Sequence, residues 1–332
     1  MHLTESVHRP LSYGKAINEA LRQSMELCED VIVLGQLVDY KSGVFGTTTG
    51  LADRFGPGRV QDFPNSENLM TATAMGAALA GLRPVVVHQR FDFMLYSLDA
   101  IANWLGLWYF KSAGKSDMPV TIRAIVGKGW GQGPQHSKSL HAWLAHLPGL
   151  RVAIPATADD AKGLLMDSVF SQTPAVFIEG RSLFPMTTNV PEKPYRVRFG
   201  QATIRRTGCD ATIVAIGNMV PIALRAAAAL ERDGIQVEVV DPRTISPLDT
   251  ATICASVAKT RRLLVTDPGW HSFGVAAEIV ATVAEELGGE LKAKPVRVCL
   301  PDSHTPMSAT LEEQYYPEET ALETAVRRMV RL

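Results

Sequence analysis

The chain alternates, along most of its length, between short runs of branched apolar residues and longer segments with helical spacing. Apolar runs occupy residues 31–35 (VIVLG), 84–91 and 174–180, and amphipathic stretches such as 14–28 and 65–82 separate them. Short, continuous apolar runs beside glycine are typical of strands buried in a parallel sheet. Strand–helix alternation therefore predicts an α/β fold, with a mainly parallel sheet covered by helices on both faces.

The pattern continues in both halves of the chain and is interrupted once. Over residues 184–198 (FPMTTNVPEKPYRVR) three prolines occur and the periodicity disappears. We therefore expect two doubly wound domains, over residues 1–185 and 198–332, joined by a linker over 186–197. The other segments assigned from the pattern are strands at 119–127, 150–156, 210–217, 237–243 and 262–267, and helices at 95–113, 158–170, 220–234, 248–260 and 273–288.

Composition restricts the environment and the partners. The 332 residues carry 33 Lys and Arg against 34 Asp and Glu, so charge provides no reason to expect nucleic acid or a membrane surface as a partner. The four cysteines are far apart in the sequence, as is typical of reduced thiols. The longest apolar run, residues 74–82, is much shorter than the roughly 20 residues of a membrane span, and the first residues lack the apolar core of a signal peptide. We predict a cytoplasmic protein.

Two segments could carry chemistry. The first, DFPNSE at residues 62–67, opens a predicted helix; its ordinary explanation is that Ser66 caps the helix and Glu67 favours its positive end. The second, residues 127–139, holds four glycines and His136 after a predicted strand, where ligands of α/β proteins usually bind. Its alternative is a surface loop with a solvated histidine. These residues alone predict a two-domain α/β enzyme or binding protein.

Several longer strings together carry a resemblance. FGPGRVQDFPNSE (55–67) runs into GAALAGLRPVV, and further matching strings follow in order at 91–93, 133–137, 148–162, 239–249, 305–307 and 311–313. Over essentially its whole length the chain resembles the beta subunit of thiamine-diphosphate-dependent 2-oxoacid dehydrogenases of the pyruvate, branched-chain and acetoin types. That family is related to the pyrimidine-binding half of transketolase, so the resemblance implies a pyrimidine-binding domain followed by a transketolase-C-like domain.

The resemblance implies roles for individual residues. Glu67 corresponds to the carboxylate that hydrogen-bonds the aminopyrimidine and so activates the cofactor ylid for decarboxylation. Phe93 corresponds to the aromatic ring stacked on the pyrimidine, with a core phenylalanine as the alternative. Leu69 belongs to the low-polarity surroundings of the cofactor. His136 corresponds to a loop histidine that contacts the reacting intermediate.

The resemblance also implies cofactors and a partner. The superfamily holds the diphosphate through magnesium on a GDG segment, and this sequence has none. We therefore expect an alpha subunit that carries the diphosphate and magnesium, in an α2β2 heterotetramer, with a lipoyl acyltransferase as a further partner. A potassium site is implied at segments that match this family: Val120, Ser168, Val169, Ser171 and Thr173.

The sequence departs from the family in one place that matters for proton transfer. The segment GQLV (35–38) has Gln36 where an acidic residue is usual, and an amide cannot shuttle a proton as a carboxylate can. The leading function is 2-oxoacid decarboxylation with acyl transfer to a lipoyl carrier. The alternatives are a split transketolase-like or acyloin-forming enzyme acting on an aldehyde or sugar, and a non-catalytic scaffold subunit.

Overall fold

The computed structural model describes residues 7–129 and 131–331. The chain forms two compact units. The first contains the residues up to Gly127 together with Leu144–Phe199, and the second contains Lys128–Trp143 and the residues from Gly200 onward. The glycine-rich segment therefore belongs to the second unit, although it lies in the first half of the sequence.

A parallel sheet forms the centre of the first unit. Its strands are β2 (Val31–Gly35), β3 (Val60–Asp62), β4 (Arg83–His88), β5 (Thr121–Val126), β6 (Arg151–Ala153) and β7 (Ala175–Gly180). They lie in the order β6-β7-β5-β4-β2-β3, and each neighbouring pair is parallel. The expected α/β fold is confirmed, and the loops that follow β2, β3 and β4 leave the sheet at one edge.

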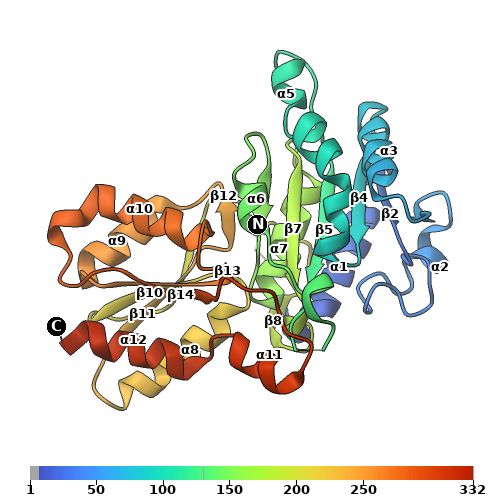
Figure 1. Ribbon diagram of the computed structural model, residues 1–332. Coiled ribbons are helices and arrows are strands. Elements are labelled where there is room, and N and C mark those ends of the chain that lie inside the picture. The colour runs from blue at the N-terminus through green and yellow to red at the C-terminus, as the bar shows by residue number, and fades with distance from the viewer. Residues whose placement is uncertain (1–6, 130, 332) are drawn as a thin grey trace. The chain divides into compact units, whose positions relative to one another are not determined.

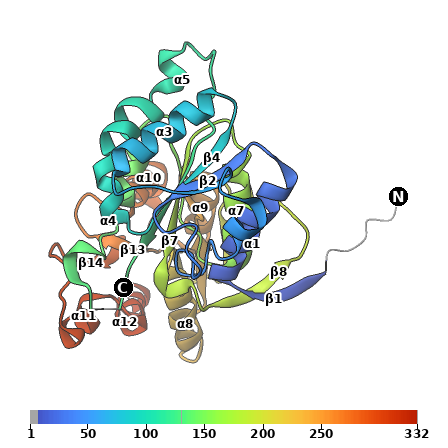
Figure 2. The ribbon, with the colours of Figure 1, turned by 90° about the vertical axis from the view of Figure 1, so that its right-hand side faces the viewer.

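Helices cover both faces of this sheet (Figure 2). The helices α1 (Tyr13–Leu27) and α7 (Ala158–Val169) pack on one face, where Val33 and Val85 point into their shared core. The helix α3 (Glu67–Leu79) covers the other face. Side chains alternate between the two faces along a strand. A strand that is buried on both faces is therefore apolar at every position, as the sequence shows.

The helix expected over 95–113 is broken into pieces. The chain forms α4 (Phe91–Met94), the 3₁₀ turn η1 (Leu95–Ser97), the π-helical segment η2 (Ala100–Leu105) and α5 (Trp108–Lys111). Gly106, which follows the π-helical segment, passes so close to the Pro148 carbonyl that an added Cβ would lie 3.0 Å from its oxygen. The close approach of Gly106 to Pro148 lies at the point where the helix is interrupted. The other short helical elements between residues 50 and 184 are α2 (Leu51–Phe55), η3 (Gly133–Gln135), α6 (His141–Ala145) and η4 (Arg181–Leu183).

The segment 186–197 differs from the linker that we expected. It contains the strand β8 (Thr187–Pro191), which pairs antiparallel with β1 (His8–Ser12) near the N-terminus. The sequence did not predict this strand, because the segment contains proline and lacks alternating apolar residues. A two-stranded ribbon at the surface needs neither a buried face nor a full ladder of hydrogen bonds.

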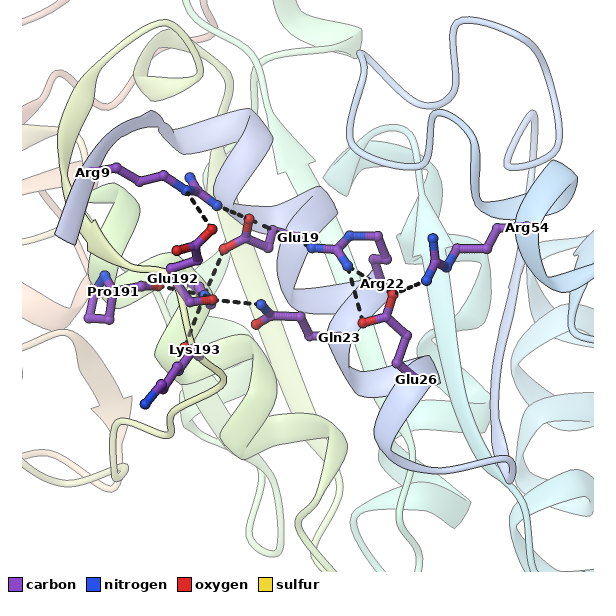
Figure 3. Close-up of polar contacts among 10 residues, drawn as sticks. Arg9, Glu19, Arg22, Gln23, Glu26, Arg54, Pro191, Glu192 and Lys193 are labelled. Carbon is purple, nitrogen blue, oxygen red and sulfur yellow. Dashed lines mark hydrogen bonds and ion pairs between the residues drawn. The ribbon is translucent and has the colours of Figure 1, made fainter. Parts of the chain in front are cut away.

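A buried lysine fastens the same segment to the first unit. Lys162 of α7 is fully buried, and its Nζ lies 2.7 Å from the Pro191 carbonyl oxygen and 3.1 Å from that of Glu192. It also donates to Glu19 of α1 at 2.7 Å, and Figure 3 shows Glu19 and Arg9 beside Glu192. A buried ammonium needs acceptors for its protons, so these carbonyl groups are held against α1 and α7.

The second unit is built on another sheet. Its strands are β9 (Thr203–Arg206), β10 (Ala211–Ala215), β11 (Val237–Asp241), β13 (Leu263–Trp270) and β14 (Val296–Leu300), in the order β14-β13-β10-β11-β9. Only β9 runs antiparallel to its neighbour in this sheet.

Helices cover both faces of the second sheet as well (Figure 1). The helices α8 (Met219–Glu231) and α12 (Glu319–Arg331) lie on one face, and α9 (Thr250–Thr260) and α10 (Val275–Leu287) on the other. The remaining elements are β12 (Thr244–Ser246), η5 (Gly288–Glu290) and α11 (Ala309–Tyr315). Among the described residues no helix is both long enough and apolar enough to cross a membrane.

Candidate active site

A pocket of about 800 Å³ opens in the first unit where β2, β3 and β4 end. Parallel strands that end at one edge bring residues from distant parts of the sequence together there. The lining residues come from the loops after these strands and from the starts of α3 and the helical segment that follows β4: Gln36, Leu37, Asp62, Phe63, Asn65, Ser66, Glu67, Asn68, Gln89, Phe93 and Tyr96. Two of the residues predicted from the sequence, Glu67 and Phe93, therefore share one pocket.

Glu67 is the first residue of α3 and is partly buried. Its Oε1 accepts a hydrogen bond from Nε2 of Gln36 at 3.2 Å. Ser66 precedes the helix, but its hydroxyl makes no capping hydrogen bond, so the capping explanation of this segment is wrong for Ser66. The position at a helix N-terminus favours a negative charge on the Glu67 carboxylate.

The backbone around Gln36 is held in place by its surroundings. Gln36 is buried, and its backbone carbonyl oxygen accepts from Nε2 of Gln89 at 3.3 Å. The next residue, Leu37, has a left-handed φ of 59°, and its backbone N–H donates to the carboxylate of Asp62. This turn directs the Gln36 side chain toward Glu67, where its amide is a hydrogen-bond donor.

Phe93 and Tyr96 also line the pocket. Phe93 is partly buried, whereas its helix neighbours Phe91 and Met94 are each 1% exposed. Phe93 therefore differs from a fully buried core phenylalanine, because part of its ring is accessible from the pocket.

Leu69 is not brought to this pocket. It lies on the outer face of α3 and is 53% exposed, while the adjacent Met70 is fully buried in the first unit. Its expected place beside the cofactor stays a prediction.

His136 lies in the second unit, directly after η3, and is partly buried. The neighbouring Lys138 donates from its Nζ to the Pro134 carbonyl oxygen at 2.6 Å, which closes a tight turn around the histidine. The two units contribute Glu67 and His136 separately.

The segment expected to hold potassium is already engaged in hydrogen bonds. Nη1 of Arg83 donates to the carbonyl oxygens of Val169 and Ser171 at 3.2 and 3.0 Å. The Ser171 hydroxyl accepts from the backbone N–H of Thr173 at 2.9 Å. The backbone carbonyl oxygens of the other two expected ligands also have N–H partners: that of Val120 accepts from Ala175, and that of Ser168 from Ser171. A cation here would share these oxygens with a guanidinium.

A buried ion pair lies within the same sheet. Nε of Arg123 in β5 lies 2.6 Å from Oε1 of Glu179 in β7, and both side chains are fully buried. Burial raises the pKa of Glu179, and the charge of Arg123 opposes that shift. Arg123 also donates to the Thr47 hydroxyl at 2.9 Å, which fastens the loop after β2 to the sheet.

Sequence analysis did not single out Gln89, and it included Asp62 only as part of the segment 62–67. Each stands at or just after the end of a short strand, and this position was the available signal. Over the described residues, no cluster of three or more His, Cys, Asp or Glu side chains could hold a metal ion.

The fold and this pocket define a pyrimidine-binding unit of the transketolase type. The family model for the transketolase pyrimidine-binding domain matches residues 9–187, and that for the transketolase C-terminal domain matches residues 200–322. A solved structure described as a split-gene transketolase in an inactive beta4 tetramer shares the fold, with a TM-score of 0.78 and 24% identity over 97% of this chain and 99% of that one.

Proteins of similar sequence identify the family more closely. The chain is 40% identical to the beta subunit of acetoin:2,6-dichlorophenolindophenol oxidoreductase from Cupriavidus necator, over 97% of this chain and 98% of the relative. It is 39% identical to the pyruvate dehydrogenase E1 component subunit beta of Bacillus subtilis, over 94% and 96%. The chain therefore belongs to the family of thiamine-diphosphate-dependent 2-oxoacid dehydrogenase beta subunits.

Proposed function

We propose that this chain activates thiamine diphosphate for decarboxylation of a 2-oxo acid, with transfer of the acyl group to a lipoyl carrier. The observation that carries the proposal is the partly buried carboxylate of Glu67 in a pocket that also presents the ring of Phe93. A carboxylate for a ring nitrogen and an aromatic face for a ring plane are the features that a pyrimidine requires.

The residues of this chain have separate tasks in the proposed reaction. Thiamine diphosphate, when bound, supplies the nucleophilic carbon and the electron sink for decarboxylation. Glu67 holds a proton between its carboxylate and a ring nitrogen of the pyrimidine, and the Gln36 amide fixes the orientation of that carboxylate. Phe93 positions the ring plane. His136, from the second unit, acts on the substrate side.

A second subunit completes the proposed site. Magnesium, held by an alpha subunit in an α2β2 assembly, would bind the diphosphate, which carries most of the charge of the cofactor. The support comes from the sequence, which has no GDG segment, and from relatives whose names describe them as beta subunits. A lipoyl acyltransferase is the proposed acceptor partner.

Potassium binding stays a prediction. The proposed ligands are mainly backbone carbonyl groups, which suit a monovalent cation, and Arg83 shares two of them. Thermal unfolding in potassium, sodium and choline chloride at equal ionic strength tests it. A higher midpoint in potassium alone supports the site, and equal midpoints in the three salts contradict it.

The proposed function is tested by calorimetry and turnover with and without the partner. We expect weak binding of thiamine diphosphate to this chain alone, and tight, magnesium-dependent binding once the cognate alpha subunit is added. The assembled enzyme should oxidise a 2-oxo acid, or cleave acetoin, with a lipoyl domain as acyl acceptor.

Other outcomes of this experiment contradict the proposal in distinct ways. Micromolar binding and turnover by this chain alone would show that the diphosphate site lies within it. Transfer to an aldehyde or sugar without any transfer to the lipoyl domain would favour the transketolase-like alternative. Assembly without turnover would favour the scaffold.

A further inference from the structure

The loop that carries His136 is rich in glycine and belongs to the second unit. Gly129, Gly131 and Gly133 have left-handed φ angles of 75°, 67° and 62°. Such backbone is readily formed by glycine, but glycine also leaves a loop conformationally free unless other contacts hold it. The contacts that hold this loop therefore decide how well His136 is placed.

A buried carboxylate binds the start of the loop. Glu312, in α11, is 4% exposed. Its Oε1 accepts from the backbone N–H of Gly129 at 2.9 Å, and its Oε2 accepts from that of Gly131 at 3.1 Å. Each carboxylate oxygen thus receives one amide proton, and hydrogen bonds of this charge-assisted kind are stronger than neutral ones.

Other contacts hold the remainder of the loop on the same unit. At Gly133 an added Cβ would lie 2.4 Å from Cγ of Met307, so the loop backbone packs directly on that side chain. Beyond the loop, Nε2 of His141 lies 2.8 Å from Oδ1 of Asp267, and both side chains are buried. Burial by itself raises the pKa of Asp267, but the interaction with His141 and the hydrogen bonds from backbone N–H groups outweigh it. The pKa of Asp267 therefore lies below its ordinary value.

Among the described residues, the carboxylate of Glu312 accepts hydrogen bonds from these two amides. It makes no other hydrogen bond or ion pair that the structure describes, whereas Lys128 at the start of the loop pairs with Glu318 at 3.2 Å. Both donors belong to the loop, so the two bonds join α11 to the loop. The geometry therefore indicates a role toward the loop.

We propose that Glu312 is a positioning residue: by accepting from Gly129 and Gly131 it holds the loop in the conformation that places His136 for the reaction. The consequence for catalysis rests on the proposed function, whereas the anchoring of the loop does not. A loop that loses both acceptors samples more conformations, and a displacement of about 1 Å at a reacting group can cost on the order of 10²-fold in rate.

Hydrogen exchange of the full-length chain tests the anchoring directly. Glu312→Gln keeps the size of the side chain but presents an NH₂ donor to one of the two amides. We expect amides over residues 129–139 to exchange about ten- to a hundredfold faster in this variant. Glu313→Gln is the matched control, because Glu313 is the next residue of the same helix, is exposed, and its side chain has no hydrogen bond with the described residues. Its loop should exchange as in the wild type.

Kinetics of the enzyme assembled with its alpha subunit test the consequence. We expect kcat to fall at least about tenfold in Glu312→Gln, with the KM for thiamine diphosphate unchanged, because the pyrimidine pocket lies in the other unit. A merely structural role would lower the urea midpoint of the chain and leave kcat of the folded fraction unaltered.

Two results would overturn the proposal. One is unchanged exchange of the loop amides in Glu312→Gln, and the other is faster exchange with wild-type kcat in the assembled enzyme. If the wild-type enzyme has no 2-oxoacid activity, the proposed function fails by itself, and the exchange comparison still decides whether Glu312 anchors the loop.

Discussion

Nε2 of Gln36 lies 3.2 Å from Oε1 of Glu67 and donates a hydrogen bond to it. An amide donor orients the carboxylate but cannot accept its proton, so Gln36 cannot relay a proton from Glu67 toward a second site. The bond holds the Glu67 carboxylate in place at the wall of the pocket.

Replacing Glu67 by glutamine should remove most of the activity and leave the fold intact. The amide has nearly the same shape but cannot exchange a proton with the pyrimidine, and one acid–base contact contributes typically about 10²–10⁴-fold to rate. The measurement is kcat of the assembled enzyme, with size-exclusion chromatography to verify assembly. Glu29→Gln, at an exposed position, is the control and should retain activity. Near-normal kcat in an assembled Glu67→Gln enzyme would refute the role of Glu67.

Replacing Gln36 by glutamate should make activity sensitive to alkaline pH. Two carboxylates at this separation repel each other unless they share a proton, so the active arrangement is lost as that proton dissociates. We expect kcat of Gln36→Glu to fall relative to that of the wild type as the pH is raised. Gln36→Met removes the donor without adding charge. Its kcat should differ from that of the wild type by the same factor at all pH values. Profiles of Gln36→Glu that run parallel to the wild type would contradict the expectation.

Replacing His136 by alanine should lower turnover with little loss of cofactor affinity. The histidine belongs to the second unit, whereas the pyrimidine pocket is formed by residues of the first. A general acid–base group on the substrate side contributes typically about 10²–10⁴-fold. Calorimetry measures cofactor binding, and saturated turnover measures the rate. A collapse of cofactor binding together with an unchanged saturated rate would show that the assigned role is wrong.

His88 should make the fold sensitive to acid. Its ring is fully buried at the end of β4, neither nitrogen has a hydrogen-bond partner in the described structure, and burial lowers its pKa from 6.5 to about 3. Below about pH 6.5 the unfolded chain therefore binds a proton that the folded chain excludes, and the free energy of unfolding falls as the pH falls. At pH 5 the protonation of His88 in the unfolded chain lowers the free energy of unfolding by about 2 kcal/mol.

Urea unfolding between about pH 7 and about pH 5 measures this effect. His88→Leu, which has a similar volume and no titratable group, should remove that part of the pH dependence and leave the stability at pH 7 within about 1.5 kcal/mol of the wild type. His88→Phe provides a second variant in case leucine packs poorly. Equal pH dependence in the wild type and in both variants would show that His88 is protonated in the folded chain or is accessible to water.

Much of the fold could be predicted because its signals are local. The run VIVLG at 31–35 and the stretch 158–170 become β2 and α7 with boundaries that differ by at most one residue. Periods of two and of 3.6 residues depend only on neighbours in the sequence, so a burial pattern can be recognised before the partner that buries it is known. The motif that ends at Glu67 likewise predicted a pocket residue.

Other features depend on which parts of the chain meet. The helix expected over 95–113 breaks where Gly106 meets Pro148, and the segment 186–197 is held by Lys162 of α7. Neither partner is near in sequence, and a single buried amine or a close backbone approach produces no periodic pattern.

The sequence by itself determined the class of fold, the family and the presence of Glu67 and Phe93 in one site, since these follow from local apolar periods and contiguous motifs. The tertiary structure decided that Gln36 donates to Glu67 and that Glu312 holds the loop of His136. The strand order β4-β2-β3 places the loop after β2 beside the start of α3. The packing of α11 on the glycine loop joins residues more than 180 positions apart. Such contacts follow from topology, because a hydrogen bond between distant residues is specified by where their elements end in space and not by the spacing of the residues around them.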